Sequence, residues 1–273
     1  MDSTSSLSFA SGFTGNITIK GVTQLGSSAQ NFTFPSASSK LILGPGNIFN
    51  GPFTYYGHYI QLNGSTFNSI ANITRYGTGN DICAGGNVFN GTTVLRDSSG
   101  HSNGFYLANV TGDTYNGDVT FIQKGTSVFI YPSYSGNSSF AGNINVDGTS
   151  AITFGQNGGQ SIMSGPFAQT VSRAGSYMPI FKKLKVNKAN SSTVSLQTTL
   201  NITDSLILVE GFILSDSVNY ITLLDNSIAT SGSPYSFVEG YMKKVGNDAF
   251  TFPLGSSVSS LSSFKNYGTY KYV

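Results

Sequence analysis

Few side chains in this sequence could carry out chemistry, and its carboxylates are the first candidates. Only 12 of the 273 residues are Asp or Glu, and they are scattered along a repetitive chain. Glycoside hydrolysis needs two carboxylates about 5–9.5 Å apart. Asp97 and Asp113 lie about one repeat apart and could face each other, as could Asp113 and Asp118 across a turn. Neighbouring repeats carry Asn at the position of Asp113, so we expect turn roles and no catalytic residues.

The remaining reactive residue types also lack a site-like arrangement. His58 and His101 lie in different repeats without metal-ligand spacing, and the single cysteine, Cys83, excludes an intramolecular disulfide. We expect Cys83 to be a buried thiol. The Gly-rich residues 155–159 lack the Gly-Lys-Ser/Thr ending of a phosphate loop. The sequence therefore predicts no metal site and no cofactor, although calcium binding in a turn by Asp113, Asp118 or Asp147 stays open.

The composition indicates a folded chain with little charge. Charged residues make up 10%, against about 25% in an average domain, while 20 Phe and 15 Tyr favour β-structure. A net charge of +2 provides no broad footprint for nucleic acid. The local cluster Lys182, Lys183, Lys185 and Lys188 is interpreted as a solvated strand edge, with a polyanion-binding patch as the alternative. No run approaches 18 apolar residues, so we expect no membrane-spanning segment.

The sequence contains a short repeated motif, called the repeat phrase below, and the elements that position these side chains follow from it. It consists of an aromatic residue between two turn signals, and its copies are residues 46–51, 64–69, 86–91, 112–117 and 136–142. The aromatic residues that mark the copies are Phe49, Phe67, Phe89, Tyr115 and Phe140, at spacings of 18, 22, 26 and 25 residues. Such self-similarity is typical of an array whose units bury their apolar faces against neighbours.

The short runs after each copy predict strands, and the chain as a whole predicts an all-β, parallel β-helix or β-solenoid of about 20–26-residue repeats. The five aromatic residues would form an internal column as the structural repeat core. The repeat turns would be made by two sets of residues, which are Gly51, Gly91, Gly117 and Gly142, and Asn50, Asn90 and Asn116. We expect the Asn side chains to hydrogen-bond neighbouring backbone.

Three segments follow from the pattern. Residues 1–165 hold the repeats of the Phe-Asn-Gly type, and residues 166–255 show apolar alternation compatible with continuing solenoid turns. A β-sandwich is the alternative for this C-terminal part. Residues 256–273 form a Ser-rich tail that we expect to be truncated.

Several phrases carry a resemblance to a known family. They are residues 86–93, 140–146 with 152–155, 181–188 and, most specific of all, the run Lys-Lys-Val-Gly-Asn-Asp-Ala-Phe-Thr-Phe-Pro-Leu-Gly at 243–255. This order resembles large repetitive surface or secreted proteins of Bacteroidetes bacteria. The resemblance implies an extracellular, adhesin-like stalk exported by the type IX secretion route. In that family the signal peptide and sorting domain lie outside the repeats, and the Ser-rich residues after Gly255 depart from its usual continuation.

The resemblance also implies O-glycosylation at Asp-Ser/Thr-apolar triplets. Two such triplets place candidate attachment sites at Ser205 and Ser217. Asn-x-Ser/Thr triplets are frequent as well, but a composition this rich in Asn, Ser and Thr generates them freely.

The function expected from the sequence is a non-enzymatic structural and adhesive stalk segment of a bacterial surface or secreted protein. Its exposed Tyr, Asn and Thr rows would bind glycans or cell-surface components weakly and repeatedly. A carbohydrate-active β-helix enzyme, either a polysaccharide lyase or a hydrolase, is the first alternative. A phage or viral fibre segment is the second. The sequence does not determine the oligomeric state, the ligand or the handedness of the solenoid.

Overall fold

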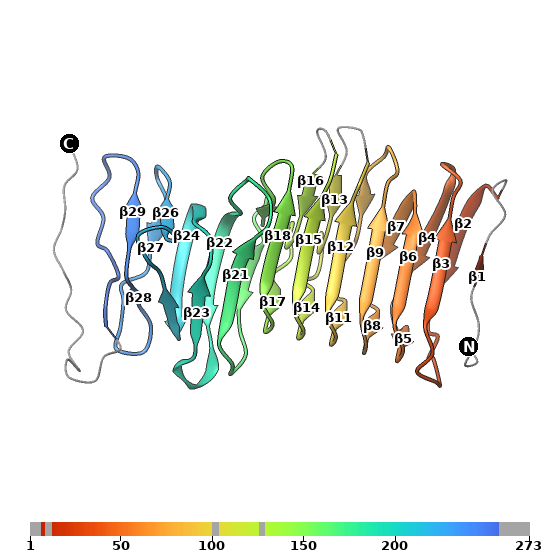
Figure 1. The fold of residues 1–273 in the computed structure, drawn as a ribbon, viewed down its shortest axis with the longest axis horizontal. Helices are drawn as coiled ribbons and strands as arrows, with labels where there is room; N and C mark the ends of the chain where they lie inside the picture. Colours follow the sequence, from red (N-terminus) through yellow and green to blue (C-terminus); the bar gives the residue numbers. More distant parts are fainter. Residues whose placement is uncertain (1–6, 9–12, 100–103, 126–128, 257–273) are drawn as a thin grey trace.

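The protein is an elongated parallel β-solenoid (Figure 1). The computed structural model describes residues 7–8, 13–99, 104–125 and 129–256. Successive turns of the chain stack side by side from the N-terminal to the C-terminal end, and every strand pairing between turns is parallel. The all-β solenoid predicted from the repeats is confirmed.

Sheet I is the long wall of the solenoid and contains 11 strands. In spatial order they are β1 (Leu7–Ser8), β3 (Gln30–Phe34), β6 (Phe53–Gly57), β9 (Ala71–Arg75), β12 (Thr93–Asp97), β15 (Val119–Gln123), β18 (Ile144–Gly148), β21 (Gln169–Arg173), β23 (Thr193–Leu196), β25 (Phe212–Leu214) and β28 (Val238–Glu239).

Sheet II is the second long wall, and two small sheets complete the N-terminal half. Sheet II contains β5 (Ile48–Phe49), β8 (Thr66–Phe67), β11 (Val88–Phe89), β14 (Thr114–Tyr115), β17 (Ser138–Phe140), β20 (Gln160–Met163), β22 (Ile180–Asn187), β24 (Leu200–Glu210), β26 (Ile221–Leu223) and β29 (Met242–Lys244), with β19 (Thr153–Phe154) beside β22 and β27 (Ile228–Ala229) beside β24. Sheet III contains β2 (Gly15–Ile19), β4 (Ser39–Leu43) and β7 (Tyr59–Leu62), and sheet IV contains β10 (Asp81–Ile82), β13 (Gly104–Tyr106) and β16 (Phe129–Tyr131).

The strands beyond residue 165 continue the same two walls. β21, β23, β25 and β28 extend sheet I, while β22, β24, β26 and β29 extend sheet II. A β-sandwich in this part would need a separate pair of antiparallel sheets, so the solenoid alternative is the one that the chain adopts. The Ser-rich residues 257–273 lie outside the described residues.

Alternation along each strand of sheet I separates the core from the surface. In β12, Thr93, Leu95 and Asp97 are buried, while Val94 and Arg96 between them are partly exposed. Successive side chains in a strand point to opposite faces, and parallel register repeats the same face one turn later. Each wall therefore has a continuous inner face, where apolar side chains form the core beside some buried polar ones, and a continuous outer face of mixed side chains.

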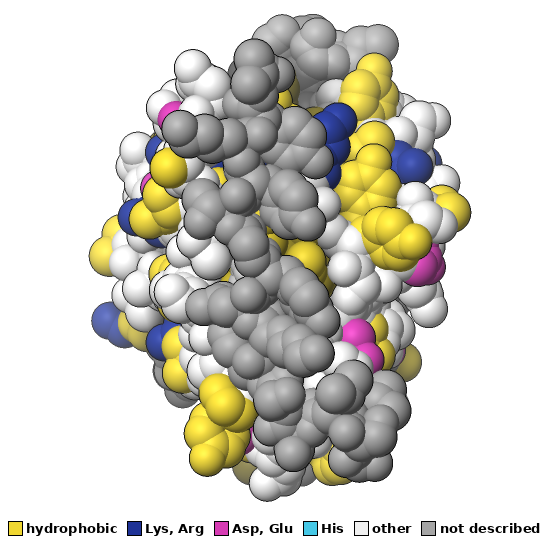
Figure 2. Space-filling model, turned by 90° about the vertical axis from the view of Figure 1, so that its left-hand side faces the viewer, with side chains coloured by type: hydrophobic (Ala, Val, Ile, Leu, Met, Phe, Trp, Pro, Cys, Tyr) yellow, Lys and Arg dark blue, Asp and Glu magenta, His cyan; other side chains and the backbone are white. Residues whose placement is uncertain are grey.

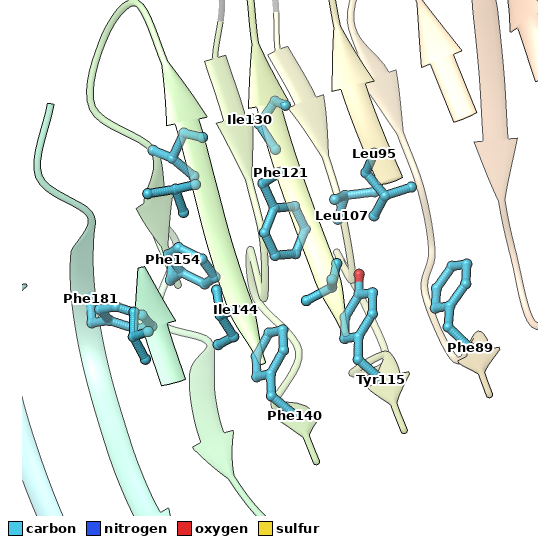
Figure 3. Packing of buried hydrophobic residues seen from close by; sticks show 14 of the residues in the cluster. Phe89, Leu95, Leu107, Tyr115, Phe121, Ile130, Phe140, Ile144, Phe154 and Phe181 are labelled. Carbon is cyan, nitrogen blue, oxygen red and sulfur yellow. The ribbon is translucent and has the colours of Figure 1, made fainter. Parts of the chain in front are cut away.

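The aromatic residues of the repeat phrase lie in one buried column, of which Figure 3 shows Phe89, Tyr115 and Phe140. Ring centroids along it are separated by 5.3, 4.9, 5.0 and 4.9 Å, and the last three pairs are within 6° of parallel. The phrase forms more than a corner, because its aromatic residue lies on a short strand of sheet II. In-register pairing, such as that of Phe89 with Tyr115, holds the rings at the spacing of adjacent strands, about 4.8 Å.

The repeat-turn glycines are required by close approach between turns. A Cβ atom built on Gly51, Gly91, Gly117 or Gly142 would lie 2.3–2.6 Å from backbone of the preceding turn. At Gly142, for example, the nearest atom is the Gly117 carbonyl carbon at 2.3 Å. Any side chain at these positions would push two turns apart.

The turn asparagines form a ladder, which differs from the expected bonds to backbone. Asn68 donates to Asn50, Asn90 donates to Asn68, and Asn116 donates to Asn90, each through Nδ2 to Oδ1 at 2.7 Å. Only the first member, Asn50, donates to a backbone oxygen, that of Gln24. Stacked identical amides satisfy each other because the turns repeat at hydrogen-bonding distance.

Candidate functional site

The carboxylates singled out for catalysis do not come together at the surface. Asp97 closes strand β12 on sheet I, and Asp113 precedes β14 on sheet II, and both side chains are buried. Asp118 is exposed in a turn, where its oxygens accept hydrogen bonds from the backbone N–H and side-chain amide of Asn143. A polysaccharide in solution could reach neither buried carboxylate in the folded chain.

Asp97 belongs to a buried ion cluster with Arg75 and Asp81. The Arg75 guanidinium lies 2.8 Å from Asp97 Oδ2 and 3.1 Å from Asp81 Oδ2, and all three side chains are inaccessible to solvent. Arg75 also donates to the Gly77 and Gly79 carbonyls. Burial raises the pKa of Asp81 to about 6, although the Arg75 charge opposes that rise. The cluster links the C-terminal ends of β9 and β12 in sheet I to β10, the first strand of sheet IV.

Asp113 belongs to a second buried feature, a column of polar side chains beside the aromatic column. Its Oδ1 accepts from the Asn87 backbone N–H at 2.9 Å and from Asn87 Nδ2 at 2.8 Å. Its own backbone N–H donates to Ser138 Oγ, and Asn87 in turn accepts from the Ser65 N–H. Burial raises the pKa of Asp113 to about 6, and the hydrogen bonds oppose that rise. This column was not predicted from the sequence. Its signal is the polar residue after the first Gly of four phrase copies, which is Asn47, Ser65, Asn87 or Asp113.

The other residues with reactive side chains do not form a site in the described part of the chain. Cys83 is buried, as predicted, and burial raises the pKa of its thiol well above the usual range. His101 lies outside the described residues. In the described part of the chain no group of three His, Cys, Asp or Glu side chains is close enough to hold a metal ion. Asp147, a candidate for calcium, is paired with Lys124.

The interpretation of the lysine cluster as a strand edge is wrong. β22 carries Lys182, Lys183 and Lys185, and it lies between β20 and β24 in the interior of sheet II. Lys188 is fully buried, where its ammonium donates to the Ser164 carbonyl and to Gln169 Oε1. Burial lowers the pKa of Lys188 to about 8.

The two candidate glycosylation sites differ in accessibility. Ser205 lies within β24 and is 7% exposed, so the folded chain does not present its hydroxyl. Ser217 is exposed in the connection between β25 and β26. Its neighbour Asp216 accepts the backbone N–H groups of Val218 and Asn219 at 2.7 Å. Burial therefore disfavours Ser205, whereas the exposure of Ser217 keeps it open as a candidate.

The outer face of sheet I contains an open groove across β6, β9 and β12. The groove encloses about 470 Å³ and is lined by Tyr56, Asn72, Thr74, Val94, Arg96 and Ser98. Register explains its shape, because Tyr56 pairs with Thr74 and Thr74 pairs with Arg96. A short side chain thus lies between two long ones on the same face. The two walls stand two strand spacings apart, about 9.6 Å at the Cα atoms.

The wall beside β6 is aromatic. Tyr56 is 53% exposed, and its ring lies 4.8 Å from that of Tyr76, which in turn lies 4.3 Å from the His58 ring. Burial lowers the pKa of His58, so this wall is uncharged near neutral pH. Tyrosine rings combine a large apolar face with a hydroxyl group, which suits them to contact flat ligands that carry hydroxyl groups.

The opposite wall is the guanidinium group of Arg96. No described residue forms an ion pair or a hydrogen bond with Arg96. The floor and rim provide an amide from Asn72 and hydroxyls from Thr74 and Ser98. The groove therefore offers one aromatic face, several neutral hydrogen-bonding groups and one cation.

A second, partly exposed aromatic cluster lies on sheet IV and the residues after it. Tyr106 and Tyr131 have ring centroids 5.3 Å apart, and Tyr134 is 4.8 Å from Tyr106. Phe129 stacks on Tyr131 at 5.7 Å and is 37% exposed. Elsewhere charged side chains are sparse, and on the C-terminal end of the solenoid they are scattered among uncharged ones (Figure 2).

No helix in the described part of the chain is long and apolar enough to cross a membrane. Comparison of the chain with protein-family models, with curated proteins and with solved structures found no match.

Proposed function

We propose that this chain is a non-enzymatic structural and adhesive segment of a bacterial surface or secreted protein, and that it binds glycans through its outer faces. The observation that carries the proposal is the groove on sheet I, where a half-exposed tyrosine faces neutral hydrogen-bonding side chains on a rigid sheet. Sites on rigid elements hold their geometry without ordering costs on binding. The resemblance to exported Bacteroidetes proteins suggests the extracellular location.

The stalk role rests on the way the turns support each other. Each turn buries its aromatic residue against the next, and the glycine corners let the turns approach closely. Stability in such arrays is a sum of neighbour contacts, so length can be added without new folding problems. The second aromatic cluster on sheet IV adds another contact surface, and two weak sites on one rigid body strengthen attachment to a repetitive polymer.

The burial of Asp97 and Asp113 supports a binding role over hydrolysis, because glycoside hydrolysis needs two carboxylates at the substrate. The proposal predicts that beads coated with the full chain are retained on immobilised polysaccharides, such as pectin and agarose, without release of reducing ends.

A matched pair of variants tests the groove. Thr74→Arg fills the floor between the two walls without touching the core, and we expect it to reduce retention. Ser172→Arg adds the same side chain on β21, outside the groove, and should leave retention unchanged. Retention no better than that of uncoated beads on every polymer would contradict glycan binding, and polymer cleavage would contradict the non-enzymatic role.

A further inference from the structure

We propose that the sheet I groove selects acidic polysaccharides, with Arg96 binding a carboxylate or sulfate group of a sugar that lies against Tyr56. This inference rests on the proposed glycan binding and names its ligand class. It follows from three observations, which are the state of Arg96, the charges around it and the spacing of the groove walls.

The Arg96 guanidinium is exposed to the groove and has no protein partner among the described residues. The other arginine of this region, Arg75, is buried and holds two carboxylates and two carbonyls. A guanidinium has five donors in a planar fork that matches carboxylate and sulfate oxygens. No residue in the described part of the chain therefore occupies the donors that Arg96 offers to a ligand.

Close to Arg96 the surface carries little negative charge. The exposed Asp118, just before β15, lies at the opposite end of the neighbouring strand and accepts hydrogen bonds from Asn143. Asp81 and Asp97 are the only carboxylates between residues 13 and 99, and both are fully buried against Arg75. On the outer face of sheet I, the nearest carboxylate in register beyond Arg96 is Asp147, two strands away and paired with Lys124. An anionic group at Arg96 would therefore meet a cation, while the nearby carboxylates of the outer face lie at the far end of β15 or are paired with Lys124.

The spacing fits a sugar ring with an acidic substituent. Thr74 leaves a floor one strand wide between Tyr56 and Arg96, because the three residues are in register on adjacent strands. A pyranose ring lying on this floor would contact the Tyr56 ring with its apolar face and direct an exocyclic anion towards Arg96. Asn72 and Ser98 could donate to its hydroxyl groups.

The experiment compares acidic and neutral forms of the same polymers with the full chain. Isothermal calorimetry would use oligogalacturonate and its fully methyl-esterified form for the carboxylate arm, and a sulfated galactan and its desulfated form for the sulfate arm. We expect at least one acidic form to bind at least about tenfold more tightly than its neutral counterpart, and the preference to weaken with added salt.

Arg96→Gln should remove the preference for the acidic form while keeping weak binding of the neutral form through Tyr56. Arg173→Gln is the matched control, because it removes the same charge from β21 of the same sheet, where Arg173 donates to the Ser176 carbonyl outside the groove. Its binding should equal that of the unmodified chain. Arg96→Lys should retain part of the preference, since lysine keeps the charge without the fork.

The outcomes separate the two proposals. Equal binding of acidic and neutral forms, or equal losses in Arg96→Gln and Arg173→Gln, would overturn acid selectivity and leave glycan binding intact. No binding to any of the four polymers would overturn both. Selective binding followed by cleavage of the acidic polymer would support the ligand class and overturn the non-enzymatic role.

Discussion

Asp113→Asn is predicted to stabilise the solenoid at neutral pH. The carboxyl group of Asp113 is fully buried and accepts two hydrogen bonds from Asn87 at one oxygen, Oδ1. Its other oxygen, Oδ2, and the nearby Tyr115 hydroxyl make no hydrogen bond of standard geometry. An asparagine would keep a carbonyl oxygen that accepts the two hydrogen bonds from Asn87. Its NH2 group would lie beside the Tyr115 hydroxyl oxygen, which can accept a hydrogen bond from that group. The equivalent positions in two other turns, Asn47 and Asn87, already carry this residue.

The magnitude follows from the pKa of Asp113, which burial raises from 3.8 to about 6. The folded state then binds the proton more tightly than the unfolded state. Stability from this group is therefore fully present below pH 4 and is lost as the pH rises through about 6. A difference of about two pKa units corresponds to about 3 kcal/mol. We expect Asp113→Asn to match the unmodified chain near pH 4 and to exceed it by up to about 3 kcal/mol at pH 7.

Urea unfolding followed by circular dichroism from pH 4 to pH 7.5 would measure this difference. Asp118→Asn is the control, because it removes one carboxylate from an exposed turn; its difference from the unmodified chain should not grow over the same range. The reasoning would be refuted if Asp113→Asn were destabilising at pH 7, or if its effect were the same at pH 4 and pH 7, since neither result is compatible with a buried charge at this position.

Three further variants test the packing and the ion cluster by urea unfolding. Gly142→Ala should lower the free energy of unfolding by about 1–3 kcal/mol, because the new Cβ would lie 2.3 Å from the Gly117 carbonyl carbon. In the control Gly44→Ala the new Cβ would lie 3.3 Å from its nearest atom, so the free energy of unfolding should fall much less. Equal losses in the two variants would contradict the close-approach argument. Phe89→Ala should lose about 3–5 kcal/mol, because its buried ring is stacked on both sides, and a loss below about 1 kcal/mol would contradict a packed column. Arg75→Leu should lower the free energy of unfolding by about 3–5 kcal/mol at pH 7.5, because it leaves the buried carboxylates of Asp81 and Asp97 without their cation. The loss should be smaller at pH 5, where these carboxylates can take up protons. A loss that does not depend on pH would contradict this account.

The repeating chemistry of the turns could be predicted from the sequence. An aromatic residue followed by a turn recurs at 18–26 residues, and the turn is Asn-Gly in three of the five copies. Each position has a local physical reason. The ring needs burial, and the glycine must leave room for the next turn. These requirements act within one turn or between identical positions of adjacent turns, so the periodic pattern carries them. The column from Phe49 to Phe140 and the tight glycine corners are the result.

The roles of the charged residues could not be predicted in this way. The four lysines that resemble a strand edge in the sequence belong to an interior strand or, at Lys188, to its buried continuation. Asp97, for which we expected a turn role, faces inward and forms an ion pair with Arg75 of the preceding turn. Whether such a residue is buried depends on which face of its strand it occupies and on which turn lies beside it. Both change with the length of the connections between strands.

The sequence by itself determined that this chain stacks short strands around an aromatic column. Only the tertiary structure decided that Tyr56, Thr74 and Arg96, which are 18 and 22 residues apart, form one groove. The physical reason is register, because side chains on adjacent turns become neighbours only when the connections between them bring their strands into alignment. No local preference of these three residues encodes that alignment. It is the outcome of the whole stack.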